Sequence, residues 1–424
     1  MKHVILGAGP AGVIAAETIR KHAPDDDIVI VGDEPEAPYS RMAIPYLLMG
    51  HIGEEGTHLR HAKDHFESLG IVVKRGRRAL SVDTAACTVA LDDGRALRYD
   101  RLLIATGAQP ASAPIPGIDS PGVHACWTLQ DARAIAARAS KGARVLQMGA
   151  GFIGCIIMEA LAERGVDLCV VEMGDRMVPR MMGPTAGGMI RDWCQSKGVR
   201  VFTGTKVESI EGQSPLRARL SNGSHIDCDL LISATGVRPN IGFLENTDIK
   251  CLLGVLTDEH LQTSVAGVYA AGDCAEAFDK VSGKTIVSAI QPNAAEQARV
   301  AALNMVGRRA ELRGVTQINV LDTLGLISTS FGNWEGVPGG EHVELTDRSG
   351  AQGGRHLSLQ FDGDLLTGCN SIGWTDHVGV MRGLVEGQVR LGAWKQRLLE
   401  DPTQLMPAYL ACAQAQQAHA LVKA

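Results

Sequence analysis

Two glycine-rich turns of the same form are the residues of this sequence whose spacing points most directly to chemistry. The first is Gly7-Ala8-Gly9-Pro10-Ala11-Gly12, after the apolar run 3–6, and the second is Gly149-Ala150-Gly151-Phe152-Ile153-Gly154, after the run 144–148. The first glycine of such a turn allows a tight bend, the second lets a pyrophosphate approach the backbone, and the third lets a helix pack on a strand. The helix that follows presents unpaired N–H groups and partial positive charge to the phosphates. Two copies predict two bound dinucleotides, and electron transfer between them is the simplest reason to hold both.

The elements around the two turns form an internal repeat. Each half is expected to contain a buried strand, the turn, a helix, a second strand, a meander of short strands and a buried strand that ends in Ala-Thr-Gly. In the first half the expected strands include 2–6 and 27–31, the helix is 10–22, and the closing motif is Ala105-Thr106-Gly107. In the second half the first strand is 144–148, the helix is 152–164, and the strand 230–234 leads into Thr235-Gly236. The repeat predicts an α/β fold with two Rossmann-like, three-layer ββα domains that bind dinucleotides.

An acidic residue near the end of the second strand of such a unit is expected to bind the adenosine ribose. In the second half this residue is Glu172, about 20 residues beyond the turn. Its carboxylate would repel a 2′-phosphate and so favours NADH over NADPH, whereas the nearby Arg176 argues the other way. In the first half the equivalent position is Gly32, and either Asp33 or Glu34 could reach the ribose.

The rest of the chain predicts how these units are completed. The strand 268–271 ends in Gly272-Asp273, and a long helix is expected from about 293 to 306. After residue 314 the pattern changes to alternating strands, followed by helical segments at 375–387 and 402–417, which indicate a C-terminal α+β interface domain. Proline-rich composition after residue 109 marks a domain crossing. The predicted domains are 1–110 with 244–314, 111–243, and 315–424.

Composition and charge narrow the function classes. The 424 residues carry a formal net charge of -6, without a basic stretch that would suggest nucleic acid and without an apolar run long enough for a membrane span. A strand that starts at Lys2 leaves no room for a signal peptide, and the ten scattered cysteines include no CxxC pair. We therefore expect a cytoplasmic protein with reduced cysteines and no metal site.

The order of these motifs resembles the FAD-containing pyridine nucleotide–disulfide oxidoreductase family over residues 1–306. The turn Pro38-Tyr39-Ser40-Arg41 is similar to the FAD-contacting turn of NADH oxidases, ferredoxin and rubredoxin reductases and the flavin part of nitrite reductases. The resemblance implies that the first fingerprint binds FAD, the second binds NAD(H), and Asp273 contacts the ribityl chain. The residues expected to contact a cofactor are Gly7, Gly9, Pro10, Ala11, Gly12, Asp33, Glu34, Ser40, Arg41, Ala105, Thr106, Gly107, Gly149, Gly151, Phe152, Ile153, Gly154, Glu172, Thr235, Gly236, Gly272 and Asp273.

The sequence departs from the family pattern at two places. The segment 40–47, where the family's disulfide reductases place two cysteines and its NADH oxidases keep one, has none. The position that usually carries a glutamate after the second fingerprint is Ile156, so either NADH is held differently or hydride transfer is slow, and plain helix packing is the alternative. Phe152 resembles the aromatic gate over the flavin, with core packing as its alternative, and His377 is expected in the first turn of a helix without a catalytic role.

These features together predict an FAD-dependent NADH oxidoreductase in which the flavin itself is the reacting group. The expected acceptor is an iron–sulfur protein such as a ferredoxin or rubredoxin, or a partner enzyme. Three alternatives stay open: an NADH oxidase, a thiol or coenzyme A-disulfide reductase that uses a distant cysteine such as Cys369, and a slow redox-sensing flavoprotein. The C-terminal strands are expected to form a homodimer interface, and residues near Trp394 could instead bind a protein partner.

Overall fold

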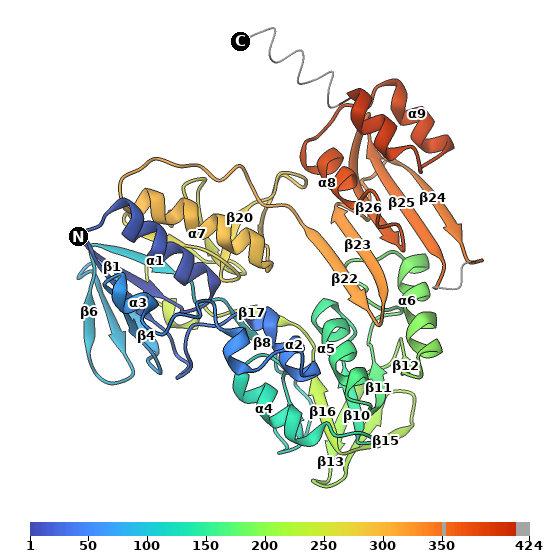
Figure 1. Cartoon of the computed structure of the whole chain (residues 1–424), viewed down its shortest axis with the longest axis horizontal. Coiled ribbons are helices and arrows are strands. Elements are labelled where there is room, and N and C mark those ends of the chain that lie inside the picture. The colour runs from blue at the N-terminus through green and yellow to red at the C-terminus, as the bar shows by residue number, and fades with distance from the viewer. Residues whose placement is uncertain (350–352, 413–424) are drawn as a thin grey trace. The chain divides into compact units, whose positions relative to one another are not determined.

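Each glycine-rich turn follows the central strand of a five-stranded parallel sheet in the computed structural model, which describes residues 1–349 and 353–412 (Figure 1). The chain divides into two compact units. The first comprises Met1–Gln109 and Val237–Val315, and the second comprises Pro110–Gly236 and the described residues from Thr316 onward. Residues 110–236 and the C-terminal strands belong to one unit, so the two units do not separate the second predicted domain from the third. The division into three domains stays a prediction.

The first unit is built around a sheet with the strand order β19-β7-β1-β2-β3. Its strands are β1 (Lys2–Leu6), β2 (Asp27–Val31), β3 (Ile71–Lys74), β7 (Arg101–Ile104) and β19 (Val268–Ala270). All four pairings are parallel. The order reverses beside β1, and in an open sheet of this kind ligands bind at the carboxyl ends of the strands at such a point.

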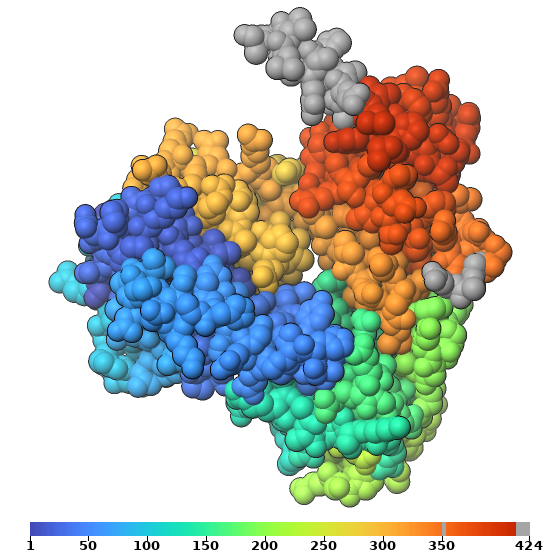
Figure 2. Space-filling view, viewed as in Figure 1, coloured from blue at the N-terminus to red at the C-terminus, as the bar shows by residue number. Residues whose placement is uncertain are grey.

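Two helices cover one face of this sheet, and a meander covers the other. The helices α1 (Pro10–His22) and α7 (Gln291–Met305) lie side by side, and their surfaces adjoin in Figure 2. Ile5, Ile19 and Ala298 belong to the apolar core between helices and sheet. The meander is β4 (Ala79–Asp83), β5 (Thr88–Leu91) and β6 (Ala96–Arg98), whose Val89 packs in the core on the opposite face. The predicted three-layer ββα arrangement is confirmed here.

Short elements complete the first unit. They are η1 (Arg41–Ala43), α2 (Ile44–Met49), η2 (Glu54–Thr57), α3 (His65–Ser68), β8 (Ala108–Pro110), β17 (Val237–Pro239), η3 (Gly242–Leu244), β18 (Val255–Leu256), β20 (Ala275–Phe278) and β21 (Thr285–Val287). The strands β8 and β17 pair with each other, and β18, β20 and β21 form a small sheet. The segment that carries Ser40 and Arg41 therefore enters a 3₁₀ turn and then the short helix α2.

The second unit repeats this plan. Its sheet has the order β12-β11-β10-β16-β9. The strands are β9 (Val123–His124), β10 (Arg144–Met148), β11 (Asp167–Val171), β12 (Arg200–Phe202) and β16 (Leu230–Ser233), the helices are α4 (Leu129–Arg138), α5 (Phe152–Glu163) and α6 (Pro184–Ser196), and the meander is β13 (Val207–Glu211), β14 (Leu216–Leu220) and β15 (His225–Cys228). The register pairs Leu6 with Val31 and Met148 with Val171, so equivalent residues of the two halves can be compared directly.

The C-terminal residues of the second unit form an antiparallel sheet with the order β22-β23-β26-β25-β24. Its elements are β22 (Ile318–Thr323), β23 (Leu326–Gly332), β24 (Glu341–Asp347), β25 (Arg355–Asp362), β26 (Leu365–Ile372), α8 (Val378–Glu386) and α9 (Ala393–Glu400). Asn370 on β26 accepts a hydrogen bond from the Gly183 N–H (2.8 Å) and donates one to the Met181 carbonyl (2.9 Å). The C-terminal sheet is thereby tied to the start of α6.

The predicted fold class is confirmed, with small corrections at element ends. The helix predicted at 375–387 spans 378–386, and His377 is its N-cap residue, not part of its first turn. The helix predicted at 402–417 starts at residue 405, and residues 413–417 lie outside the described part of the chain. The helices α4 and α6 were not predicted.

Candidate functional site

The first glycine-rich turn accepts only glycine at two of its positions. Gly7 has φ +118°, and a Cβ atom there would lie 2.0 Å from the Ala105 carbonyl oxygen. A Cβ atom on Gly12 would lie 2.0 Å from the Gly7 carbonyl oxygen. Gly9 differs, because a Cβ atom there would meet no heavy atom within 4 Å. The space beside the middle glycine is therefore open, whereas the outer glycines are needed for the bend and for helix packing.

The second turn has the same geometry. Gly149 has φ +94°, and its Cβ atom would lie 2.3 Å from the Ala234 carbonyl oxygen. A Cβ atom on Gly154 would lie 2.5 Å from the Gly149 carbonyl oxygen, and one on Gly151 would again meet nothing within 4 Å. Two turns thus leave an open space at the middle glycine.

Both open spaces adjoin the start of a helix. Gly9 is the N-cap residue of α1, and Gly151 is the N-cap residue of α5. Neither cap makes a side-chain hydrogen bond, so the first N–H groups of these helices are left without a side-chain acceptor. An anionic phosphate is the group that such a helix start and such a space accommodate. Both turns therefore fit a pyrophosphate, and their roles in binding FAD and NAD(H) stay predictions.

The Asp273 carboxylate is largely removed from solvent, as expected for a group that contacts a bound ligand. It follows β19 and Gly272, whose N–H donates to the buried Gln297 side chain at 2.7 Å. Burial raises the pKa of Asp273, and the positive charge of Arg41 opposes this effect. No hydrogen bond to this carboxylate is found among the described residues, and a desolvated carboxylate without a partner is costly. A polyol hydroxyl would satisfy it.

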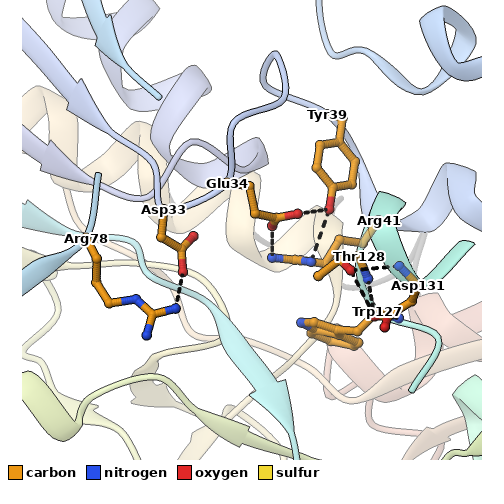
Figure 3. A network of polar contacts seen from close by, with 8 residues as sticks. All are labelled: Asp33, Glu34, Tyr39, Arg41, Arg78, Trp127, Thr128 and Asp131. Carbon is orange, nitrogen blue, oxygen red and sulfur yellow. Dashed lines mark hydrogen bonds and ion pairs between the residues drawn. The ribbon is translucent and has the colours of Figure 1, made fainter. Parts of the chain in front are cut away.

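Arg41 links the turn at 38–41 to the end of β2. Its guanidinium forms an ion pair with Glu34 at 2.7 Å and lies over the Tyr39 ring, 5.7 Å from the centroid. The Tyr39 hydroxyl donates to the other oxygen of Glu34 at 2.6 Å, which closes the network in Figure 3. Ser40 donates to the Gln291 side chain at the start of α7 (2.8 Å). These bonds hold the predicted FAD-contacting turn in place.

The two acidic residues after β2 have different surroundings. Glu34 is held by Arg41 and Tyr39, whereas Asp33 is more exposed and pairs with Arg78 at 3.4 Å (Figure 3). Asp33 thus has the freer carboxylate for a ribose.

The two Ala-Thr-Gly motifs also make equivalent turns. Gly107 and Gly236 have φ of +66° and +114°, values that suit glycine. The Thr106 hydroxyl donates to the Asn240 carbonyl (2.7 Å), and the Thr235 hydroxyl donates to the Ala111 carbonyl (3.1 Å). The carbonyls of the alanines that precede these threonines limit Gly7 and Gly149, so each motif shapes the turn beside it.

Glu172 is engaged more closely than the sequence indicated. Its two carboxylate oxygens accept hydrogen bonds from the N–H groups of Ala150 and Gly174, each at 2.7 Å. The residue is only 9% exposed, so it is not a solvated residue at the end of the strand. Arg176 is occupied by its own loop, since it donates to the Met182 carbonyl at 2.8 Å and pairs with Asp175 at 2.7 Å.

Two buried glutamines were missed by sequence reasoning. Gln147 on β10 donates from Nε2 to the carbonyls of Gly149 and Gly154, both at 2.9 Å. Gln297 on α7 accepts from Gly272, as described above. Both side chains are fully buried. The signal that could have revealed Gln147 is a polar residue in the middle of an otherwise apolar strand.

The sequence matches the model of a known protein family. The model of the pyridine nucleotide-disulphide oxidoreductases matches residues 1–301. The chain belongs to this family. The predicted resemblance is therefore confirmed, and membership makes the chain an oxidoreductase of pyridine nucleotides.

Individual members of the pyridine nucleotide-disulphide oxidoreductase family are similar over nearly the whole chain. Subunit epsilon of the NADH-dependent phenylglyoxylate dehydrogenase of Aromatoleum evansii is 31% identical over 406 residues, which cover 95% of each chain. The ferredoxin–NAD(+) reductase component of the biphenyl dioxygenase system of Paraburkholderia xenovorans is 30% identical and covers 92% of this chain and 94% of its own. The NAD-dependent persulfide reductase of A. fulgidus has a TM-score of 0.86 at 28% identity, with 93% of this chain and 78% of that chain covered.

The disulphide in the family's name has no counterpart in the segment 40–47, which contains no cysteine. All ten cysteines lie in the described residues, and all are free. Cys369 is fully buried on β26, and burial raises the pKa of its thiol to about 12. Because the thiolate is the reactive form, Cys369 is unsuited to disulfide exchange.

The position two residues after the second fingerprint is occupied by an isoleucine on α5. Ile156 is partly buried and Ile157 fully buried on α5, one helical turn before Glu159. Burial raises the pKa of Glu159 to about 6, with Asp322 and Glu163 adding to the effect. Phe152 opens α5 and is partly buried, and its role as a gate stays a prediction.

The described residues contain neither a membrane-spanning helix nor a metal-binding cluster. None of their helices is both long and apolar enough to cross a membrane. Within the same residues, no group of three or more His, Cys, Asp or Glu side chains is arranged to hold a metal ion.

Proposed function

We propose that the chain is an FAD-dependent oxidoreductase that passes electrons from NADH through FAD to an external acceptor. The observation that carries the proposal is the pair of glycine-rich turns, each with an open space at its middle glycine and an uncapped helix start beside it. A chain with one dinucleotide would need one such turn. Two turns in separate parallel sheets match a resident flavin and an exchanging nicotinamide.

The first unit supplies the groups that would hold FAD. The turn 7–12 and the start of α1 receive the pyrophosphate, Asp33 or Glu34 receives the adenosine ribose, and Asp273 accepts a hydrogen bond from the ribityl chain. Arg41 offsets the negative charge near Asp273. When bound, FAD accepts hydride from NADH and releases electrons singly or in pairs, and the protein binds, orients and shields it.

The second unit favours NADH over NADPH. Glu172 is held next to the turn by two backbone N–H groups, and each carboxylate oxygen has a further lone pair for a ribose hydroxyl. The carboxylate repels a 2′-phosphate. Arg176 is the cation that could attract such a phosphate, but hydrogen bonds to Met182, Pro179 and Asp175 hold its guanidinium in its own loop.

The acceptor is proposed to be a ferredoxin- or rubredoxin-type protein or a partner enzyme. We propose that electrons leave the flavin without a thiol relay, since residues 40–47 contain no cysteine and both Cys369 and Cys274, which follows Asp273, are fully buried. Two relatives that are similar over more than nine-tenths of this chain support these acceptors. The ferredoxin–NAD(+) reductase component of P. xenovorans supports a ferredoxin-type protein, and the dehydrogenase subunit of A. evansii supports a partner enzyme.

Anaerobic stopped-flow reduction of the purified flavoprotein by NADH and by NADPH tests the proposal. We expect fast bleaching of the flavin absorbance with NADH and slower bleaching with NADPH. Addition of an oxidised ferredoxin or rubredoxin should then restore the flavin absorbance. Flavin that bleaches only over minutes with either nucleotide would contradict the proposal.

A slow redox sensor is the second candidate, and one observation favours it. Ile156 cannot hydrogen-bond the nicotinamide carboxamide, so hydride transfer could be slow. A sensor would show slow reduction together with a change in oligomeric state. An NADH oxidase would instead consume oxygen at the rate at which NADH is oxidised.

We propose an FAD domain of residues 1–110 and 244–314, an NAD(H) domain of residues 111–243, and a C-terminal interface domain of residues 315–424 that forms a homodimer. A cytoplasmic location is part of the proposal, and the ten free cysteines support a reducing compartment. Sedimentation of the holoenzyme would test the homodimer.

A further inference from the structure

The two glycine-rich turns differ in the side chain that packs against them from the preceding strand. In the first half the residue two positions before the turn is Ile5, and its Cγ2 atom is 3.3 Å from the point that a Cβ atom of Gly12 would occupy. In the second half the equivalent residue is Gln147, whose Nε2 atom is 3.0 Å from the corresponding point at Gly154. The space next to the last glycine of the turn is thus filled by an apolar side chain in the first half and by an amide in the second half.

The amide of Gln147 joins the two ends of the second turn. Both of its N–H groups are used, one on the Gly149 carbonyl and one on the Gly154 carbonyl, each at 2.9 Å. The side chain is fully buried, and its Oε1 atom has no hydrogen-bond partner among the described residues. Burial of the unsatisfied Oε1 atom costs free energy, whereas the two donated bonds fix the carbonyls at both ends of the turn.

A second buried side chain holds the same turn from its N–H side. Glu172 accepts the Ala150 N–H at 2.7 Å, and it uses its other oxygen on Gly174. The equivalent residue of the first half is Gly32, which has no side chain, and a Cβ atom there would lie 2.8 Å from the Ala8 Cβ atom. The second turn therefore has two polar supports that the first turn lacks.

We propose that Gln147 is a positioning residue for the nicotinamide dinucleotide, which together with Glu172 keeps the second turn in its binding shape while no nucleotide is bound. The inference rests on the proposed function, because it takes the second turn as the one that binds NAD(H). A resident flavin supports its own turn at all times, whereas a nucleotide that leaves in every turnover must find its turn already ordered. Ordering a loose turn at each binding event would weaken affinity.

Gln147→Met tests this role, because methionine has a similar volume and neither N–H donor. We expect the Kd of the holoenzyme for NAD⁺, measured by isothermal titration calorimetry, to rise about ten-fold, which equals about 1.4 kcal/mol. The limiting rate of flavin reduction at saturating NADH should stay within about two-fold, since Gln147 does not touch the reacting atoms. An unchanged Kd in a folded variant would overturn the inference.

A matched control is Thr329→Val in the C-terminal sheet. It removes a buried hydrogen bond between the Thr329 and Ser371 hydroxyls (2.7 Å) without touching the turn. We expect this variant to change the melting temperature and to leave the Kd for NAD⁺ unchanged. An equal loss of NAD⁺ affinity in both variants would mean that Gln147 acts only through general stability, and this result would overturn the inference.

Hydrogen–deuterium exchange of the wild-type holoenzyme gives an answer that does not depend on a variant. We expect the Ala150 amide, which donates to Glu172, to exchange slowly before any NAD⁺ is added, and NAD⁺ to add little protection to this amide. Fast exchange of the Ala150 amide until NAD⁺ is present would overturn the inference. Slow exchange in a wild-type protein that binds no NAD⁺ would contradict the proposed function while leaving the internal support of the turn intact.

Discussion

Replacement of Gly151 by alanine separates folding from phosphate binding. The backbone at Gly151 has φ −74° and ψ −170°, which alanine adopts readily, and the new methyl group would meet no heavy atom within 4 Å. Alanine is a poorer N-cap residue than glycine by several tenths of a kcal/mol. It also reduces the entropy of the unfolded chain, which stabilises the fold by about 0.4–1 kcal/mol. The two effects oppose each other, so the free energy of unfolding should change by less than about 0.5 kcal/mol.

Binding of the nucleotide should respond very differently. The methyl group would stand in the open space at the middle of the turn, where the pyrophosphate is expected to contact the backbone. A hydrogen bond from a backbone N–H to a charged group contributes about 1.5–3 kcal/mol. Loss of one such bond corresponds to about 2 kcal/mol, so the Kd for NAD⁺ should rise about 30-fold. The flavin content should not change, because the FAD turn lies in the other unit.

The assay combines calorimetric titration with NAD⁺ and thermal unfolding of the holoenzyme. Gly188→Ala in α6 is the matched control, since its Cβ atom also meets nothing within 4 Å and alanine favours the helix. Gly154→Ala is the opposite control, because its Cβ atom would lie 2.5 Å from the Gly149 carbonyl oxygen and must strain the turn. A Gly151→Ala protein that binds NAD⁺ as tightly as the Gly188→Ala protein would refute the assignment of the open space to phosphate.

Three ionisable groups that are partly or fully buried lead to further predictions. Asp273→Ala should lower the ratio of flavin to protein, and a ratio equal to that of the wild type would argue against the ribityl contact. The same variant should raise the melting temperature of the flavin-free protein, because burial raises the pKa of this carboxylate and its charge therefore costs stability. Burial raises the pKa of Glu159 from 4.5 to about 6, so its stabilising protonated form is complete below pH 4.5 and is lost as the pH rises through 6. Glu159→Gln should therefore raise the free energy of unfolding in urea at pH 7.5 by up to about 1 kcal/mol after allowance for solvent screening, and should leave it unchanged at pH 4.5. Cys369, whose thiol pKa is raised to about 12, should resist iodoacetamide at pH 8 in the NADH-reduced protein, and its alkylation in a mass spectrum would revive the disulfide reductase alternative.

The sequence was sufficient for the parts of the fold in which local pattern and tertiary packing agree. The helix after the first turn was predicted at 10–22 and is observed as Pro10–His22, because its apolar face, its starting proline and the preceding glycine all indicate the same boundaries. The strands that carry the turns are short, continuous apolar runs, which are typical of buried parallel sheets. The two glycine-rich turns could be located because each directly follows such an apolar run.

Two helices of the second unit were missed although one carries a clear local signal. The Thr128 side chain accepts the Asp131 N–H, and the Asp131 carboxylate accepts the Thr128 N–H, which is a capping box at the start of α4 (Figure 3). This pattern could have been found from the sequence. The helix α6 starts at Gly183-Pro184 with two further glycines in its interior, so its local propensity is weak and its packing decides its structure.

The hydrogen-bond partners of Gln147 and Glu172 could not have been predicted, because they depend on which backbone groups come within reach of each buried side chain. Glu172 was expected from its place in the sequence to face a ribose, but its two bonds to backbone N–H groups depend on the register of β10 against β11. Gln147 stands in a strand that otherwise reads as plain core. Its partners are carbonyl oxygens, and no periodicity of side chains reports where these point.

The differences between the halves are therefore more informative about function than their similarity. The repeated strand, turn and helix explain why both halves can bind a dinucleotide, but they give no reason for one to stay and the other to leave. Ile5 and Gly32 leave the first turn without a polar support, and Gln147 and Glu172 provide two such supports to the second. A turn that keeps its shape when empty suits a ligand that exchanges, since the cost of ordering is met once, on folding. If this reasoning holds, Gln147→Met should slow the association of NAD⁺ as well as weaken its binding, because fewer encounters would find the turn in its binding shape.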